Sequence, residues 1–401
     1  MLRIRPEHAH AGMELALPIY HPSRPDAVIL KPGVKLEQST VDRVREMGLP
    51  EIWARHPKLD GLQMFVSSAL HQRRAQAAQA AQALFDRVAR SMEKPDFSQA
   101  QAAGDNLAEC IAGLGRAALH VQEFVFPSNP LAARASNIAF VSLLMASRLD
   151  AYLIRERPKL DSQHARDVGP LGLAALVHDI GVPRLAPEVI ERWERHRDET
   201  DPEWRRHVLL GYEIVQSNIP PAASATVLNH HQRFDGSGYP ARRAGSGELV
   251  AVTGRNIHIF ARIVGCAELF ERLRDDGEQR RSVIETLDLM RNDVHRHGID
   301  QTIFRALLAV VPPYPPGTIV TISSGQDCVV TDFRPDDPCN PVVQPLDSLE
   351  DSGAIPIDLA EEGGLSIIRV GSDDVGALNF TPADMQRYEE EQEAEAEPEA
   401  A

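Results

Sequence analysis

The stretch from Asn229 to Pro240 constrains this chain more than any other part of it. It reads Asn-His-His-Gln-Arg-Phe-Asp-Gly-Ser-Gly-Tyr-Pro, so a histidine pair, His230 and His231, precedes a glycine-rich turn. Neutral imidazole is the commonest side-chain metal ligand. Gly236 and Gly238 allow backbone angles that other residues resist, so a tight loop can fold back over whatever the histidines hold. For the pair alone, one packed and one solvated histidine before an ordinary turn is the simpler interpretation.

A second element upstream changes that interpretation. Residues 171–177 are apolar and predict a helix, which ends in His178 and Asp179, with Gly181 as its stop. Together with this element, a metal-binding role for the histidine pair becomes the better interpretation.

His-Asp-Ile-Gly at 178–181 and His-His-x-x-x-Asp-Gly-x-Gly-Tyr-Pro at 230–240 resemble the HD-GYP family, a branch of the HD metal-dependent phosphohydrolases. The resemblance covers roughly residues 67–331. It implies a mainly α fold, an HD-type helical bundle with small β-rich appendages at the N- and C-terminal ends. It also implies a signalling enzyme, a phosphodiesterase that opens cyclic di-GMP to linear pGpG and, in a further step, forms GMP.

Charge and hydropathy narrow the classes of partner. The chain has 42 Lys and Arg against 58 Asp and Glu, a formal net charge of −16. An acidic chain argues against nucleic acid, whose non-specific binding depends on phosphate neutralisation by basic residues. No apolar run approaches the roughly 20 residues that cross a bilayer, and residues 1–6 contain no hydrophobic signal segment. We therefore expect a cytoplasmic protein that does not bind a membrane.

Composition shifts divide the chain into four predicted units. Residues 1–56 are a small N-terminal β-rich module, 67–311 the helical HD-GYP domain, and 312–382 a C-terminal β-containing extension. Residues 383–401 form an acidic tail that we expect to be disordered. The Ala- and Gln-rich helix predicted at 67–92 packs on the main domain or forms a homodimer contact.

The resemblance implies a set of metal ligands: His178, Asp179, His207, His230, His231 and Glu268. His207 has the expected spacing, four residues before a glycine. Glu268 lies on the apolar stripe of a helix predicted at 257–273, where a carboxylate is costly unless it is paired or ligates a metal. The alternative for Glu268 is an ion pair with an arginine such as Arg262 or Arg272. Asp179, the natural bridging carboxylate, and His178 are the candidate catalytic residues.

This mixture of imidazole and carboxylate, without thiolates, suits iron or manganese. Asp179, His207, His230 and His231 would complete one site. The other would keep only His178, Asp179 and Glu268, because Arg134 stands where the family has a histidine. Arginine stays protonated and cannot ligate a metal. We therefore expect one firm divalent metal and a second that is weak or absent.

Further departures from the family pattern surround the same site. Val182 stands in place of a lysine, Gln232 in place of a glutamate, and Glu268 in place of an aspartate. Two hypotheses follow: an active cyclic di-GMP phosphodiesterase, which we favour, or a catalytically inactive relative that acts as a cyclic di-GMP sensor or protein scaffold.

The candidate substrate-binding residues come from the rim of the predicted site. They are Arg134, Tyr239, Arg280 and Arg281. Arg134 can hold a phosphate oxygen, although a surface arginine on an amphipathic helix is an equal alternative. The resemblance also makes a GGDEF-domain protein a candidate partner.

Overall fold

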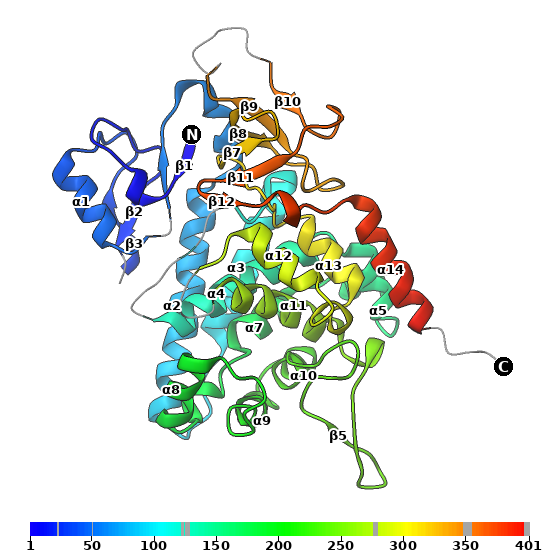
Figure 1. Ribbon diagram of the computed structural model, residues 1–401. Helices are drawn as coiled ribbons and strands as arrows, with labels where there is room; N and C mark the ends of the chain where they lie inside the picture. The colour runs from blue at the N-terminus through cyan, green and yellow to red at the C-terminus, as the bar shows by residue number, and fades with distance from the viewer. Residues whose placement is uncertain are drawn as a thin grey trace.

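The computed structural model describes residues 1–21, 24–49, 51–121, 124, 129–275, 280–347 and 355–396. Its helices form one body, with a small strand-and-helix unit near the N-terminus and a β-sheet toward the C-terminus (Figure 1). The predicted fold class, mainly α with small β-rich appendages at both ends, is confirmed. The limits of the four predicted units stay predictions.

The N-terminal unit contains two antiparallel strand pairs and one helix. β1 (Leu2–Ile4) pairs with β4 (Ile52–Ala54), and β2 (Ile19–His21) pairs with β3 (Arg24–Leu30). Helix α1 (Gln38–Glu46) buries two valines against the small core between the strands. The unit is thus held by its own apolar cluster.

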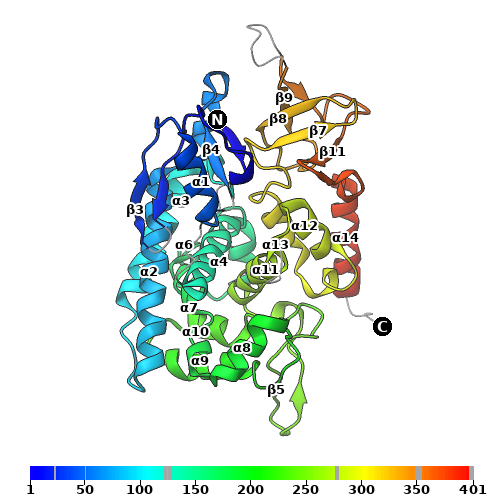
Figure 2. The ribbon, with the colours of Figure 1, turned by 60° about the vertical axis from the view of Figure 1, so that its left-hand side comes forward.

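The helical body is organised around a buried central helix, α4. Every residue of α4 from Ala135 to Ala146 is buried, and the helix packs against α2, α7, α11 and α13 (Figure 2). The helices of the body are α2 (Ser68–Arg90), α3 (Ser98–Leu114), α4 (Pro130–Ala146), α5 (Asp150–Glu156), α6 (Ser162–Ala165), α7 (Gly169–Val177), α8 (Pro187–His196), α9 (Arg206–Val215), α10 (Pro221–Asn229), α11 (Ile259–Arg274), α12 (Val283–Arg291) and α13 (Gln301–Leu308).

The C-terminal sheet contains six antiparallel strands in the order β10-β9-β8-β7-β11-β12. The segment leading into it contacts the N-terminal unit, because the amide of Arg3 donates to the carbonyl of Gly317 at 2.9 Å. The strands are β7 (Ile319–Ile322), β8 (Asp327–Asp332), β9 (Val342–Pro345), β10 (Ile357–Asp358), β11 (Ile367–Val370) and β12 (Asp373–Asp374). A separate hairpin, β5 (Arg242–Arg243) with β6 (Leu249–Val250), projects from the connection between α10 and α11 (Figure 1).

The prediction of a disordered tail from residue 383 is wrong for most of its length. Helix α14 (Pro382–Ala396) forms there and packs beside α13 (Figure 1). The side chain of Gln392 accepts from the amide of Gln301 at 2.8 Å and donates to the carbonyl of Ile299 at 2.8 Å. These hydrogen bonds give an acidic segment a fixed place that its composition does not indicate. Residues 397–401 lie outside the described residues.

Within the described ranges, no single helix is both long and apolar enough to cross a membrane. α4 and α5 reach that composition only as a pair, which is bent by 92°. The apolar character of α4 is explained by its burial in the body.

A buried ionic network joins α5, α11 and the start of α13. Arg262 is 6% exposed and forms ion pairs with Glu156 and Asp300. The hydroxyl of Tyr152 donates to Asp300 at 2.7 Å and accepts from Arg262 at 2.9 Å. Arg262 is therefore occupied away from Glu268, which rules it out as the partner considered from the sequence.

Replacing Arg262 by methionine should destabilise the fold by about 3–5 kcal/mol, because two buried carboxylates lose their compensating charge. Arg255 offers a matched control: it pairs with the same Glu156 at 3.4 Å, but its side chain is 61% exposed. Arg255→Met should cost less than about 1 kcal/mol. Equal effects of the two substitutions in urea denaturation would contradict this account of the network.

Candidate metal centre

Three histidines of the site are fixed by the same local device. The Nδ1 atoms of His178, His207 and His230 hydrogen-bond the carbonyl oxygen three residues earlier, at 2.8, 2.7 and 2.9 Å respectively. Because a carbonyl only accepts, each Nδ1 carries the proton. Each Nε2 is then left with a free lone pair, which is the state that binds a metal.

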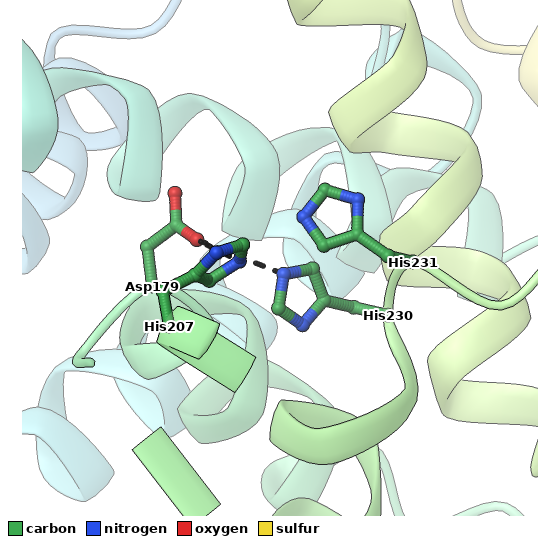
Figure 3. A group of neighbouring side chains, drawn as sticks. All are labelled: Asp179, His207, His230 and His231. Atoms are coloured by element: carbon green, nitrogen blue, oxygen red, sulfur yellow. Dashed lines mark ion pairs between the residues drawn. The ribbon is translucent and has the colours of Figure 1, made fainter. Parts of the chain in front are cut away.

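The Nε2 atoms of His207 and His230 face the carboxylate of Asp179, which follows α7 (Figure 3). Nε2 of His178 lies against the same carboxylate. His207 and His230 place Nε2 at 3.4 and 3.6 Å from Oδ1, and His178 places its Nε2 at 3.3 Å from Oδ2. All three Nε2 atoms and Oδ1 are buried without a hydrogen-bond partner. Buried polar atoms are rarely left unpaired, so their clustering indicates a ligand that binds among them.

The spacing of these atoms fits one first-row metal ion. Two ligands at about 2.1 Å from an ion are about 3.0 Å apart at a right angle and about 3.4 Å apart at a tetrahedral angle. The separations of 3.4 and 3.6 Å to Oδ1 are close to that range. Donor atoms of Asp179, His207, His230 and His231 all lie within 4.8 Å of one another. The geometry therefore brings together the four residues predicted for the firm site.

The loop after α10 holds His231 in place. Its ring stacks on Tyr239 with centroids 4.6 Å apart and an interplanar angle of 14°. The amide of Tyr239 donates to the carbonyl of His231 at 3.2 Å, which folds the loop back as expected. Gly236 has a φ of 84°, whereas a Cβ on Gly238 would lie 2.4 Å from that same carbonyl oxygen. The first glycine is needed for its conformation and the second for the close approach of the two segments.

Electrostatics favour the metal-binding protonation states of Asp179, His207 and His231. Burial would lower the pKa of His178, but the adjacent Asp179 outweighs that effect and raises it above its ordinary value. Burial alone would raise the pKa of Asp179, but neighbouring imidazoles, His178 first, lower it well below its ordinary value. Burial lowers the pKa of His207 to about 4. Burial and the neighbouring His230 lower the pKa of His231 well below its ordinary value. An ionised carboxylate and neutral imidazoles are the forms that ligate a metal.

Glu268 lies in a different group from the one predicted. Its carboxylate gathers with Glu199 and His231, with donor atoms within 4.8 Å of one another, rather than with His178 and Asp179. Its arginine partner is Arg272, whose Nε lies 3.3 Å from Glu268 Oε1.

Glu199 was not predicted from the sequence. It lies in the connection between α8 and α9, and its Oε1 is 3.3 Å from Nδ1 of His231. Burial would raise the pKa of Glu199, but His231, Arg272 and Arg233 outweigh that effect and lower it well below its ordinary value. In the sequence, Glu199 lies in an acidic segment that leads to the helix of His207. That position alone does not distinguish Glu199 from the other acidic residues of the segment as a metal ligand.

The predicted substrate-binding residues occupy three different settings. Arg134 is half-buried on α4, and its charge acts on Glu271 and Arg197. Tyr239 is 7% exposed and supports His231. Arg280 is exposed, and Arg281 donates to the carbonyl of Leu273 at 2.6 Å, at the end of α11. Their contact with a substrate stays a prediction.

These features define a class of protein: a helical domain that gathers histidines and an aspartate in a buried metal site. Residues 143–303 match the family model described as HD domain. The His-Asp motif at 178–181 and the His-His to Tyr-Pro motif at 230–240 lie within this match, so residues 143–303 are similar to an HD domain and contain the motifs that resemble the HD-GYP family.

Several known proteins are similar to this chain. The cyclic di-GMP phosphodiesterase PA4108 of Pseudomonas aeruginosa is 26% identical over 221 residues, 53% of this chain and 50% of that protein. The cyclic di-GMP phosphodiesterase response regulator RpfG of Xanthomonas campestris pv. campestris is 29% identical over 126 residues, 31% of this chain and 30% of that protein. Both matches span half or less of the relative. The solved structure of Bd1817, an HDG"Y"P protein from Bdellovibrio bacteriovorus, covers 76% of this chain and 97% of its own, with 13% identity and a TM-score of 0.43.

Gly181 allows α9 to bring His207 to Asp179. Its φ is −80°, so the residue is not needed for a left-handed helix stop, contrary to the role predicted from the sequence. A Cβ on Gly181 would lie 2.0 Å from the carbonyl oxygen of His207 and 2.5 Å from the amide nitrogen of Gly211. The absence of a side chain is what permits the two backbones to touch.

Gly181→Ala should therefore destabilise the fold by about 3 kcal/mol or more, because backbone atoms have to move apart. The variant should also lose metal, since His207 moves with its helix. A Cβ on Gly113 of α3 would meet no atom within 4 Å, so Gly113→Ala is the matched control and should be neutral or stabilising. Thermal unfolding and elemental analysis of both variants test this, and a metal-loaded, fully stable Gly181→Ala would contradict it.

Proposed function

We propose that this chain is a metal-dependent phosphodiesterase that hydrolyses cyclic di-GMP to linear pGpG and, in a further step, to GMP. The observation that carries the proposal is the convergence of Nε2 of His207 and His230 on Asp179, at 3.4 and 3.6 Å. The HD domain match and the names of two similar proteins support the same reaction class and substrate.

Asp179, His207, His230 and His231 would hold the metal, which we propose to be iron or manganese because the donors are imidazole and carboxylate. A bound divalent ion would supply the Lewis acid and the activated water that phosphodiester hydrolysis needs. Asp179 directs one oxygen to His207 and His230 and the other to His178. It is therefore the residue best placed to connect the metal to the rest of the site.

The surroundings of the cluster suit an anionic substrate. The donor residues are 0–4% exposed, so charge interactions there are screened less than at the surface. Arg134, Arg280 and Arg281 are the proposed contacts for the phosphates, and Tyr239 contributes by holding His231. The cytoplasmic location, a GGDEF-domain partner and a homodimer contact through residues 67–92 stay predictions from the sequence.

Asp179→Ala and His230→Ala should each strip the metal and abolish hydrolysis of cyclic di-GMP. Loss of a residue that hydrogen-bonds and orients a metal ligand costs about 10–100-fold in metal affinity. Loss of the ligand itself should therefore cost more. The measurement is metal content by elemental analysis together with chromatographic detection of pGpG and GMP. His164→Ala is the control, because His164 is exposed and pairs with Asp161.

Three outcomes separate the hypotheses. Metal and turnover in the wild type, both lost in the two alanine variants, would support the phosphodiesterase. Metal and nucleotide binding without turnover would instead favour the inactive sensor or scaffold. Full metal content in Asp179→Ala and His230→Ala would refute the site assignment, and turnover of another cyclic dinucleotide alone would refute the substrate.

A further inference from the structure

A second group of donors lies directly beside the first and shares His231 with it. The group consists of Glu199, His231 and Glu268, with donor atoms within 4.8 Å of one another. Nδ1 of His231 is buried and has no hydrogen-bond partner, and it lies 3.3 Å from Glu199 Oε1. By donor type and spacing, this is a place for a second divalent cation.

The side chain of Arg272 already provides a cation there. Arg272 lies one helical turn beyond Glu268 on α11, and its side chain is 12% exposed. Its Nε lies 3.3 Å from Glu268 Oε1, and its Nη2 lies 3.1 Å from Glu199 Oε2. The guanidinium thus bridges the two carboxylates that a second metal would need.

The group of Asp179, His207, His230 and His231 contains no such bridging cation among the described residues. In the described part of the chain, Asp179 forms ion pairs with histidines and with no lysine or arginine. Arginine stays protonated in proteins. A second metal would have to bind carboxylate oxygens at about 2.0–2.2 Å while displacing a fixed positive charge in a buried setting. The metal at Asp179 meets no such competitor.

We propose that this protein holds a single divalent metal, at the group containing Asp179, and that the guanidinium of Arg272 takes the place of a second metal between Glu199 and Glu268. The inference rests on the metal site of the proposed function and not on its substrate. A guanidinium offers phosphate oxygens a positive charge and directed N–H donors. Arg272 would therefore help to bind a phosphodiester, while water activation depends on the one metal.

Arg233 makes the proposal testable, because it holds Glu199 independently. Its Nη2 donates to Glu199 Oε2 at 3.2 Å. Removing Arg272 should therefore leave Glu199 near its present position, while Glu268 stays on the buried face of α11. The site they form with His231 would then be open to a metal.

The test loads metal-free protein with excess Mn²⁺, removes the unbound ion by desalting, and measures manganese per chain by elemental analysis and electron paramagnetic resonance. Wild type should hold about one ion and Arg272→Ala about two, because the permanently charged guanidinium competes with a metal for the two carboxylates and alanine does not. The double variant Arg272→Ala/Glu199→Gln should return to about one ion, since a neutral amide is a weaker metal donor than a carboxylate. Arg166→Ala removes an exposed ion pair with Asp150 and should match the wild type.

Two ions in the wild type, or none, would overturn the inference. So would one ion in a folded Arg272→Ala, with folding judged by circular dichroism. A gain of metal in Arg134→His without a gain in Arg272→Ala would assign the missing cation to Arg134 instead, which also overturns it. One ion in the wild type without cyclic di-GMP turnover would refute the proposed reaction but leave this inference intact.

Discussion

A buried carboxylate at the end of α7 is the constraint on which the site depends. Asp179 is 4% exposed, and an uncompensated charge at such a place costs several kcal/mol. His178, His207 and His230 each use Nδ1 on a backbone carbonyl, which leaves Nε2 to face the carboxylate. The arrangement therefore concentrates negative charge and free lone pairs at one point. A divalent metal satisfies both, which explains why three separate helices meet there.

That convergence requires backbones to approach more closely than side chains allow. Gly181 touches the backbone of α9, and a Cβ on Gly265 of α11 would lie 2.5 Å from the carbonyl oxygen of His230. Gly181 and Gly265 therefore allow the close backbone contacts that bring the histidine-bearing segments to Asp179. This explains why the sequence pattern is long and irregular: it combines ligands with close contacts between elements that are distant in the chain.

The sequence predicts which histidines gather around Asp179 better than it predicts their surroundings. Two motifs identify Asp179 and the histidine pair through a family resemblance, and helical spacing would have favoured Arg272 over Arg262 as the partner of Glu268. Residues four apart share a helix face, whereas Arg262, six residues earlier, points to Glu156 and Asp300. Glu199 could not be predicted, because a loop residue has no periodicity and its neighbours come from other elements. Helix α14 could not be predicted either, because its composition indicates disorder, whereas its order comes from contacts with α13, which is distant in the sequence.

Formal charge shows why two arginines near this centre have different consequences. Asp179, Glu199 and Glu268 carry three negative charges, and Arg233 and Arg272 bring two positive charges into ion pairs with the two glutamates. One negative charge is left, on the carboxylate that faces the imidazoles. One divalent ion and one phosphodiester charge then bring the site to neutrality, whereas a second ion would leave it strongly positive where screening is weak. Arg134 forms none of these ion pairs, and its charge acts on Glu271 and Arg197 instead.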